Sequence, residues 1–348
     1  MRMGRITILL SLSGLLFTGG PVVAQETSDW VDRVKISGWA FGDYYDVAAN
    51  HESELEGRNG FWFRLIYLTT DFEVDEDVDF RLTFEGSSPG DFSSASNMEP
   101  LVKDAWVRYQ PGEHGVYLGL SATPTWGTVE KEWGYRAVEK TPLDLQRMGS
   151  SRDFGLAVKG ALDSDGKVFY HAMVGNGAST GTETNPGKAG YLALGVKPAD
   201  GFTFEIYGDL NNLPGDTDKY TLQAYGGWHN DRGRLGVLYA RQWIETGPST
   251  KIDLDVFSVF GVMVINEHVS LLGRFDRLFD PNPSAAGILY LPMSPDARST
   301  FLLAGVDLAV SDHFSIIPNV EAVFYDGAGT AEAPDTDVVP RLTFSLTY

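Results

Sequence analysis

Apolar and polar residues alternate along most of the chain, in short segments separated by clusters of polar residues, glycine and proline. Alternation with a period of two residues is typical of a β-strand with one apolar and one polar face. The pattern predicts about sixteen strands. They lie near residues 34–47, 61–71, 80–85, 104–109, 114–122, 153–159, 167–176, 189–197, 201–210, 219–229, 233–243, 252–264, 268–278, 299–310, 313–325 and 337–348. In the second strand the predicted faces are Phe61, Phe63, Leu65 and Tyr67 on one side and Trp62, Arg64, Ile66 and Leu68 on the other.

The connections between these segments alternate in length. The short ones include 111–113, 163–166, 198–201, 230–232, 266–267 and 311–312, and the long ones are 48–58, 87–100, 123–151, 177–188, 211–218, 244–251, 279–298 and 326–336. In an up-and-down barrel every second connection lies at the same rim, so this alternation indicates tight turns at one rim and long loops at the other. The expected fold class is therefore all-β, a transmembrane antiparallel up-and-down β-barrel. The longest connection, residues 123–151, is expected to fold into the bore as a constriction loop.

Closure of the sheet follows from the two faces of the strands. No helical stretch is long enough to cover the apolar face, so lipid is its expected partner, and a closed sheet leaves no unpaired edge in hydrocarbon. Burying many charges in a dry core would cost several kcal/mol each, so a bore filled with water is expected on the other face. The predicted pore-wall residues are Arg64, Arg81, Asp104, Arg108, Lys159, Arg274 and Glu321.

The chain begins with Arg2, Arg5, an apolar stretch and the small-residue site Val22-Val23-Ala24, which together resemble an export signal. We expect residues 1–24 to be a signal peptide and residues 25–348 to form one barrel domain. No later stretch reaches 18 consecutive apolar residues, so no transmembrane helix is predicted. The formal net charge of −20 argues against a nucleic-acid partner. The expected location is a bacterial outer membrane, with its lipid as a partner.

The 123–151 segment carries opposed charges. Its predicted constriction and selectivity residues are Glu130, Lys131, Glu132, Arg136, Glu139, Lys140 and Arg147. Such side chains can set the selectivity of a pore, or they can pair with one another and only fix the loop to the wall, and the sequence leaves both interpretations open. For Trp126, Trp133 and Tyr135, packing that anchors the loop is favoured over a stacking path for sugars.

Signs of catalysis are sparse. The six histidines are scattered without an i, i+4 pair, and the chain has no cysteine, so no metal and no cofactor are expected. There is no GxSxG motif and no Walker glycine loop. The protein is therefore predicted not to be an enzyme. A barrel phospholipase with a serine and a histidine on its wall is the enzymatic alternative.

Several segments resemble the phosphate-selective porin O and P family of bacterial outer-membrane porins. They are WGYRAVEKTPLDLQR followed by SSRDFGLAVKGAL, then FYHAMVGNGAST, VKDAWVRY and LLGRFDRLFDPNP. The resemblance implies a porin of about sixteen strands, often a homotrimer, with one loop folded inward at mid-height.

Within that family, phosphate selectivity depends on lysines and arginines crowded along the bore, whereas the charges of residues 123–151 balance here. We therefore expect passive diffusion of small hydrophilic solutes or ions, filtered by size and charge. A substrate-specific channel for an anion such as phosphate, or for a sugar, is the alternative.

Overall fold

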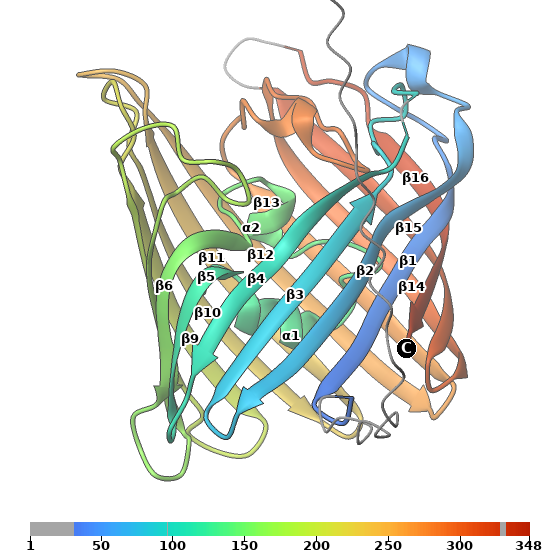
Figure 1. Ribbon diagram of the computed structural model, residues 1–348. Helices are drawn as coiled ribbons and strands as arrows, with labels where there is room; N and C mark the ends of the chain where they lie inside the picture. The colour runs from blue at the N-terminus through green and yellow to red at the C-terminus, as the bar shows by residue number, and fades with distance from the viewer. Residues whose placement is uncertain (1–30, 96, 328–331) are drawn as a thin grey trace, which may run out of the picture.

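The computed structural model describes residues 31–95, 97–327 and 332–348. The predicted signal peptide lies outside the described residues. Sixteen antiparallel strands form a closed barrel in which β1 also pairs with β16 (Figure 1). They are β1 (Val34–Asp46), β2 (Asn59–Asp75), β3 (Val78–Ser87), β4 (Glu99–Tyr109), β5 (His114–Ala122), β6 (Arg152–Ala161), β7 (Val168–Gly175), β8 (Ala189–Val196), β9 (Phe202–Asn211), β10 (Lys219–Asn230), β11 (Gly233–Glu245), β12 (Lys251–Asn266), β13 (Val269–Leu278), β14 (Ala297–Ser311), β15 (Phe314–Gly327) and β16 (Asp337–Thr347). The predicted fold class and strand number are confirmed.

In the described residues, four short helices interrupt the long connections. Two lie in the 123–151 loop, α1 (Gly127–Trp133) and α2 (Pro142–Leu145), and two are single 3-10 turns, η1 (Ser53–Leu55) and η2 (Ala285–Gly287). Gly134 follows the last residue of α1 as its C-cap, and its φ of 69° favours glycine. Helix α2 begins with proline, which suits a first helical position. Among the described residues, no helix is long and apolar enough to span a bilayer.

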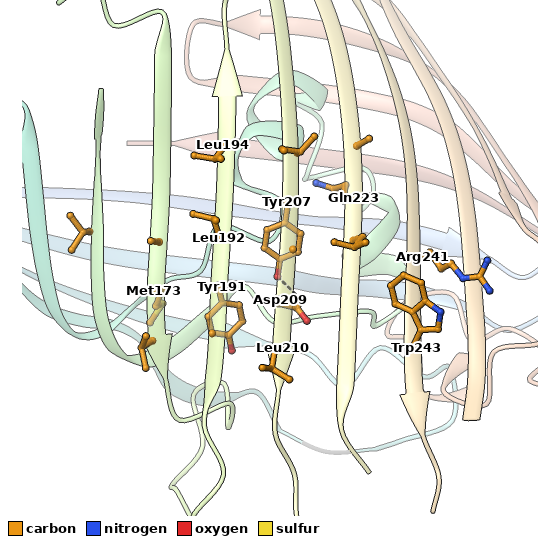
Figure 2. A pocket seen from close by; sticks show the side chains of 18 of the residues that line it. Met173, Tyr191, Leu192, Leu194, Tyr207, Asp209, Leu210, Gln223, Arg241 and Trp243 are labelled. Atoms are coloured by element: carbon orange, nitrogen blue, oxygen red, sulfur yellow. Dashed lines mark hydrogen bonds between the residues drawn. The ribbon is translucent and has the colours of Figure 1, made fainter. Parts of the chain in front are cut away.

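The outer surface of the barrel is apolar. Along β6 to β10 the outward residues include Leu156, Val174, Leu192, Leu194, Ile206, Leu210 and Leu222, all exposed. Figure 2 shows part of this wall, where the inward Tyr207 donates a hydrogen bond to Asp209. A hollow of about 1070 Å³ lies here, lined largely by the outward apolar side chains. An apolar outer face of this kind is suited to lipid.

Two of the β-bulges, at Arg64 in β2 and at Lys103 in β4, change which side chains point inward near the bore cavities. In β2, Phe41 pairs with Leu65 but Gly42 pairs with Phe63, so Arg64 is an extra residue. The predicted alternation of this strand is therefore wrong beyond Arg64. Trp62, Arg64, Leu65 and Tyr67 point inward, and Phe61, Phe63, Ile66 and Leu68 point outward, because one extra residue reverses the faces that follow.

The second bulge lies in β4. Thr83 pairs with Asp104 and Phe84 with Val102, which leaves Lys103 as the extra residue. Lys103 then points inward beside Asp104, and both line the same cavity. Strict alternation would have placed Lys103 on the lipid side with Ala105 and Val107.

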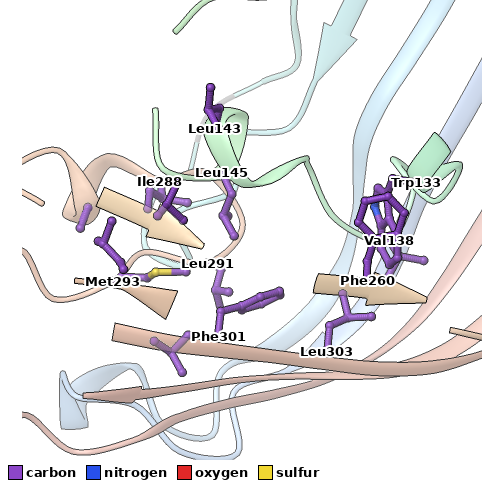
Figure 3. Packing of buried hydrophobic residues seen from close by; sticks show 14 of the residues in the cluster. Trp133, Val138, Leu143, Leu145, Phe260, Ile288, Leu291, Met293, Phe301 and Leu303 are labelled. Atoms are coloured by element: carbon purple, nitrogen blue, oxygen red, sulfur yellow. The ribbon is translucent and has the colours of Figure 1, made fainter. Parts of the chain in front are cut away.

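Protein side chains fill part of the bore. The 123–151 loop folds inside the barrel as predicted, but residues 279–298 pack inward against it, and together they form an apolar cluster with the wall (Figure 3). The most buried members include Leu143, Leu145, Met148, Ile288, Leu291, Met293, Phe301 and Val323. The expectation of a wide bore entirely filled with solvent is therefore corrected, because the inner faces of β11 to β15 carry mainly apolar side chains that need dry partners.

Candidate pore constriction

A series of cavities follows the β1 to β6 side of the bore. The central one has a volume of about 460 Å³ and lies between β1 to β4, β6 and the two inward loops. A second, of about 470 Å³, extends towards the long loops, and the two share Trp126, Lys140, Asp144, Ser151 and Leu289. A third, of about 210 Å³ near the short-turn rim, shares Arg81 with the first. The three cavities thus adjoin one another through shared lining residues along one wall of the barrel.

Charged side chains surround the central cavity in pairs. Lys103 Nζ lies 2.8 Å from Glu85 Oε2. Arg152 binds Asp104 with 2.6 Å between Nε and Oδ1. The bases that line this cavity are Arg81, Lys103, Arg136, Lys140 and Arg152, and the acids are Glu85, Asp104, Glu130 and Asp144. The two signs nearly balance, so their field orients polar solutes more than it attracts one sign of ion.

Arg136 joins two acids of its own loop. Its Nε lies 3.5 Å from Glu130 Oε2 and 3.7 Å from Asp144 Oδ2. Burial raises the pKa of Glu130 above its usual value, and the Arg136 charge offsets only part of this shift. Glu130 therefore becomes neutral at a higher pH than an exposed glutamate would.

Lys140 stands where the central cavity meets the one above it. Its ammonium lies 5.7 Å from the centre of the Tyr290 ring, and within the described part of the chain it forms no ion pair with a carboxylate. Burial lowers the pKa of Lys140, although Asp144 and Glu139 favour its charged form. Among the bases of the central cavity, Lys140 is therefore the one without an ion pair to a carboxylate in the described residues.

A buried ion network fixes both loops to the wall. Arg64 Nε lies 2.7 Å from Asp43 Oδ2, and Arg64 also reaches Glu139 and Glu321 at 3.4 Å. Arg341 completes the network, with Nε 2.8 Å from Glu321 Oε2. All five side chains are almost inaccessible to solvent. Three of the predicted site residues, Arg64, Glu139 and Glu321, therefore lie in this network and not on the surface of the central cavity.

Tyr290 connects the second loop to the same network. Its hydroxyl donates to the carbonyl of Arg64 at 2.5 Å, and its own carbonyl accepts a hydrogen bond from Arg341. Its φ of 72° is unusual for a tyrosine. The surrounding bonds hold this conformation, which directs Tyr290 and Leu289 towards the central cavity.

Arg274 is a second anchor. It is bound to Asp276, with Nε 2.9 Å from Oδ1, and it donates to the backbone carbonyl of Lys140. Nearby, Trp133 is 1% exposed and donates to the carbonyl of Glu139 at 2.8 Å. These contacts stabilise the position of residues 133–140 against the wall.

The remaining predicted residues occupy different places. Lys131 is exposed, Glu132 contacts His229 with 3.2 Å between Oε2 and Nδ1, and Arg147 donates to the Gly287 carbonyl at the upper cavity. Arg108 pairs with Asp79 beside the lower cavity, and Lys159 lines a separate recess. The structure thus brings Arg81, Asp104, Glu130, Arg136 and Lys140 together around the central cavity and leaves the other predicted site residues outside it.

Sequence reasoning did not identify several residues of the central cavity. Lys103 was missed because a bulge turns it inward, and Arg152 because it directly follows the loop. Tyr290 and Leu289 lie in residues 279–298, which the alternation of connection lengths predicts to be an external loop. The apolar residues Ile288, Leu289, Leu291 and Met293 are unusual in a solvated loop and were a usable signal.

Within the described residues, no cluster of three or more histidine, aspartate or glutamate side chains is arranged to hold a metal ion. In the same part of the chain, the serine hydroxyl bonds run to serine, aspartate, tryptophan or backbone partners, without a serine hydroxyl bonded to a histidine ring. The arrangement that the chain does provide is a charged, narrowed passage.

No protein-family model matches this chain, and no curated protein matches it in sequence. Solved structures do. An anion-selective porin from Comamonas acidovorans is similar with a TM-score of 0.69 and 10% sequence identity, over 90% of this chain and 99% of that one. OmpF of Salmonella typhi, solved with daunomycin, is similar with a TM-score of 0.65 and 10% identity, over 92% and 99% of the two chains. OmpT, an outer-membrane protein of Vibrio cholerae solved in a trimer form, has a TM-score of 0.60 and 12% identity, over 90% and 99%. The chain therefore has the fold of bacterial outer-membrane porins.

Proposed function

We propose that the protein is a porin of a bacterial outer membrane, through which small hydrophilic solutes and ions diffuse passively. The observation that carries this proposal is the series of adjoining polar cavities along β1 to β6, inside a closed barrel whose outer face is apolar. A polar passage within a lipid-facing barrel provides a route for solutes that cannot enter hydrocarbon.

The filter combines size and charge. The 123–151 and 279–298 loops narrow the bore to the side of β1 to β6, which limits the size of solutes. The paired charges of the central cavity provide a field across the passage. Because five bases face four acids there, we expect a weak preference for anions and no tight binding.

Lys140 supports a second candidate, a channel specific for an anion such as phosphate. Without a carboxylate partner among the described residues, its ammonium is available for a charge-assisted hydrogen bond to a passing anion. This candidate agrees with the resemblance to the phosphate-selective porins. Saturating currents that phosphate blocks would favour it over general diffusion.

Planar bilayers test the proposal. Purified, folded protein should give stepwise increases in current in potassium chloride, one for each channel inserted. Liposomes that contain the protein should swell in small sugars and more slowly in larger ones, since the passage excludes by size. Folded protein that inserts into the bilayer but carries no current would rule out the porin function.

Assembly as a homotrimer is also proposed, from the resemblance to porins and from the trimer form of the Vibrio cholerae protein. Analytical ultracentrifugation in detergent should give a mass three times that of the chain. A sedimenting monomer would contradict it.

A further inference from the structure

A recess of about 400 Å³ lies beside the passage, towards the rim of the short turns. It is bounded by the start of α1 and by the inner wall from β5 to β9. None of its lining residues belongs to the central cavity. It is therefore a separate compartment that the filter described above does not use.

The recess contains a base and an acid that are not paired with each other or with any other charge in the described residues. Lys159 Nζ lies 4.0 Å from the centre of the Tyr117 ring. Glu205 is 4% exposed, and its Oε2 accepts a hydrogen bond from the Thr128 hydroxyl. Its Oε1 is buried without a partner. A buried carboxylate oxygen in this state is costly, because its lost hydration is not replaced.

His171 adds a second unsatisfied atom. It faces Lys159 across the β6–β7 pair, and its Nε2 is buried without a hydrogen-bond partner. Buried polar atoms nearly always have a partner. Two such atoms in one recess therefore indicate that something outside the chain provides their hydrogen bonds.

The spacing of the charges defines what would fit. Lys159 lies on β6 and Glu205 on β9, three strand spacings apart. Three spacings of about 4.8 Å separate the two strands, and Glu205 lies two residues along β9 from Tyr207, the residue level with Lys159. The two backbones are therefore about 16 Å apart along the wall, and both side chains line the recess. A ligand that satisfies both ends must carry an acidic and a basic group separated by a short chain.

We propose that this recess binds a small zwitterionic solute, with the ligand's carboxylate against Lys159 and its ammonium against Oε1 of Glu205. The volume is near the lower end of the range of about 300–1,000 Å³ typical of ligand pockets, which suits a molecule of amino-acid size. The inference rests on the proposed function, because the solute must enter through the passage. It adds a solute-binding site beside that passage.

The test uses 4-aminobutyrate as the probe, with butyrate and butylammonium as single-charge controls. Isothermal titration of the folded, detergent-solubilised protein should show saturable binding of 4-aminobutyrate and much weaker binding of either control. Lys159→Gln and Glu205→Gln should each weaken binding about tenfold or more, because each removes one charge-assisted contact. Glutamine at position 205 can still accept the Thr128 hydrogen bond, so the α1 contact is retained.

Matched control variants are Lys167→Gln and Glu267→Gln, which change exposed side chains of the short turns. Both should bind 4-aminobutyrate as the unmodified protein does. Absence of saturable binding, or equal binding by unmodified protein and both recess variants, would overturn the proposal. Channel currents are recorded on the same samples, so that loss of conductance with intact binding contradicts the porin function alone, and intact conductance without binding contradicts the recess alone.

Discussion

The wall from β1 to β6 and the wall from β11 to β15 differ in what they present to the bore. The first presents charged side chains such as Arg81, Asp104 and Arg152 to the cavities. The second presents mainly apolar side chains such as Leu254, Phe260 and Phe301, which the two inward loops cover. A barrel of this width therefore does not by itself define the passage. The passage lies where the loops leave the wall uncovered, and the chemistry of each wall decides which side that is.

The largest effect is expected from disrupting the buried ion network that holds both inward loops against the wall. Arg64→Leu leaves Asp43 and Glu139 buried with fewer partners, which should cost about 3–5 kcal/mol. Both loops should loosen, so we expect lower resistance to urea unfolding, followed by tryptophan fluorescence, and a larger, noisier single-channel conductance.

Arg108→Leu is the matched control. Its pair with Asp79 is partly exposed, so its loss should cost about 0–1 kcal/mol. If both variants unfold alike and conduct like the unmodified protein, the buried network does not hold the loops.

A substitution in the apolar cluster should lower the free energy of unfolding without changing the charge of the passage. Leu143→Ala removes a fully buried side chain between the loop and the wall, and we expect a loss of about 2–5 kcal/mol in the free energy of unfolding. Ion selectivity should stay close to that of the unmodified protein. Leu162→Ala changes an exposed leucine at a short turn and should cost no more than about 0.5 kcal/mol. Equal stability of the two variants would show that the cluster is not a dry core.

Changes to the charged residues on the β1 to β6 side of the bore should alter ion selectivity more than the free energy of unfolding. Neutralising Arg136 and Lys140 together, as Arg136→Gln with Lys140→Gln, leaves Glu130 and Asp144 without their nearest base. One unit charge at about 4 Å in water contributes about 1 kcal/mol, so the ratio of anion to cation permeability should fall up to about fivefold per charge.

The measurement is the reversal potential in a salt gradient, which should shift towards cations. Lys131→Gln is the control, since Lys131 is exposed and lies outside the lining of the central cavity. An unchanged reversal potential in the double variant would place the field elsewhere in the barrel.

The smallest expected effect concerns pH. The raised pKa of Glu130 means that acidification from pH 7 removes its negative charge earlier than for an exposed glutamate. The lowered pKa of Lys140 means that alkalinisation removes its positive charge earlier than for an exposed lysine. Anion preference should therefore increase as the pH falls, by less than the double variant changes it. Glu130→Gln should flatten the acidic part of the reversal-potential curve, and a retained acidic part would assign it to another group.

Much of the fold could be predicted because the alternation of residues that defines a barrel strand is visible in the sequence of the strand itself. The apolar residues of β6, β8 and β9 alternate without interruption, and the connections between strands differ in length by rim. The bulges could not be predicted, because Phe63-Arg64-Leu65 and Val102-Lys103-Asp104 look like ordinary alternation until the partner strand shows which residue is extra.

The candidate site was predictable only in part. Its location in the 123–151 loop follows from the length and polarity of that segment. The set of residues that line the cavity does not follow from the sequence. Lys140 lines the cavity, whereas its neighbour Glu139 anchors the loop to Arg64. Both residues are charged, and only their partners across the bore distinguish them.

The sequence by itself determined the barrel, its strand number, its rims and the loop that enters it, since these depend on local periodicity and on the need to pair every strand edge in an apolar environment. Only the tertiary structure decided which wall stays wet. That outcome depends on how residues 279–298 pack against residues 123–151 across the bore. Contacts between segments so far apart in the chain do not produce a periodic pattern in the sequence.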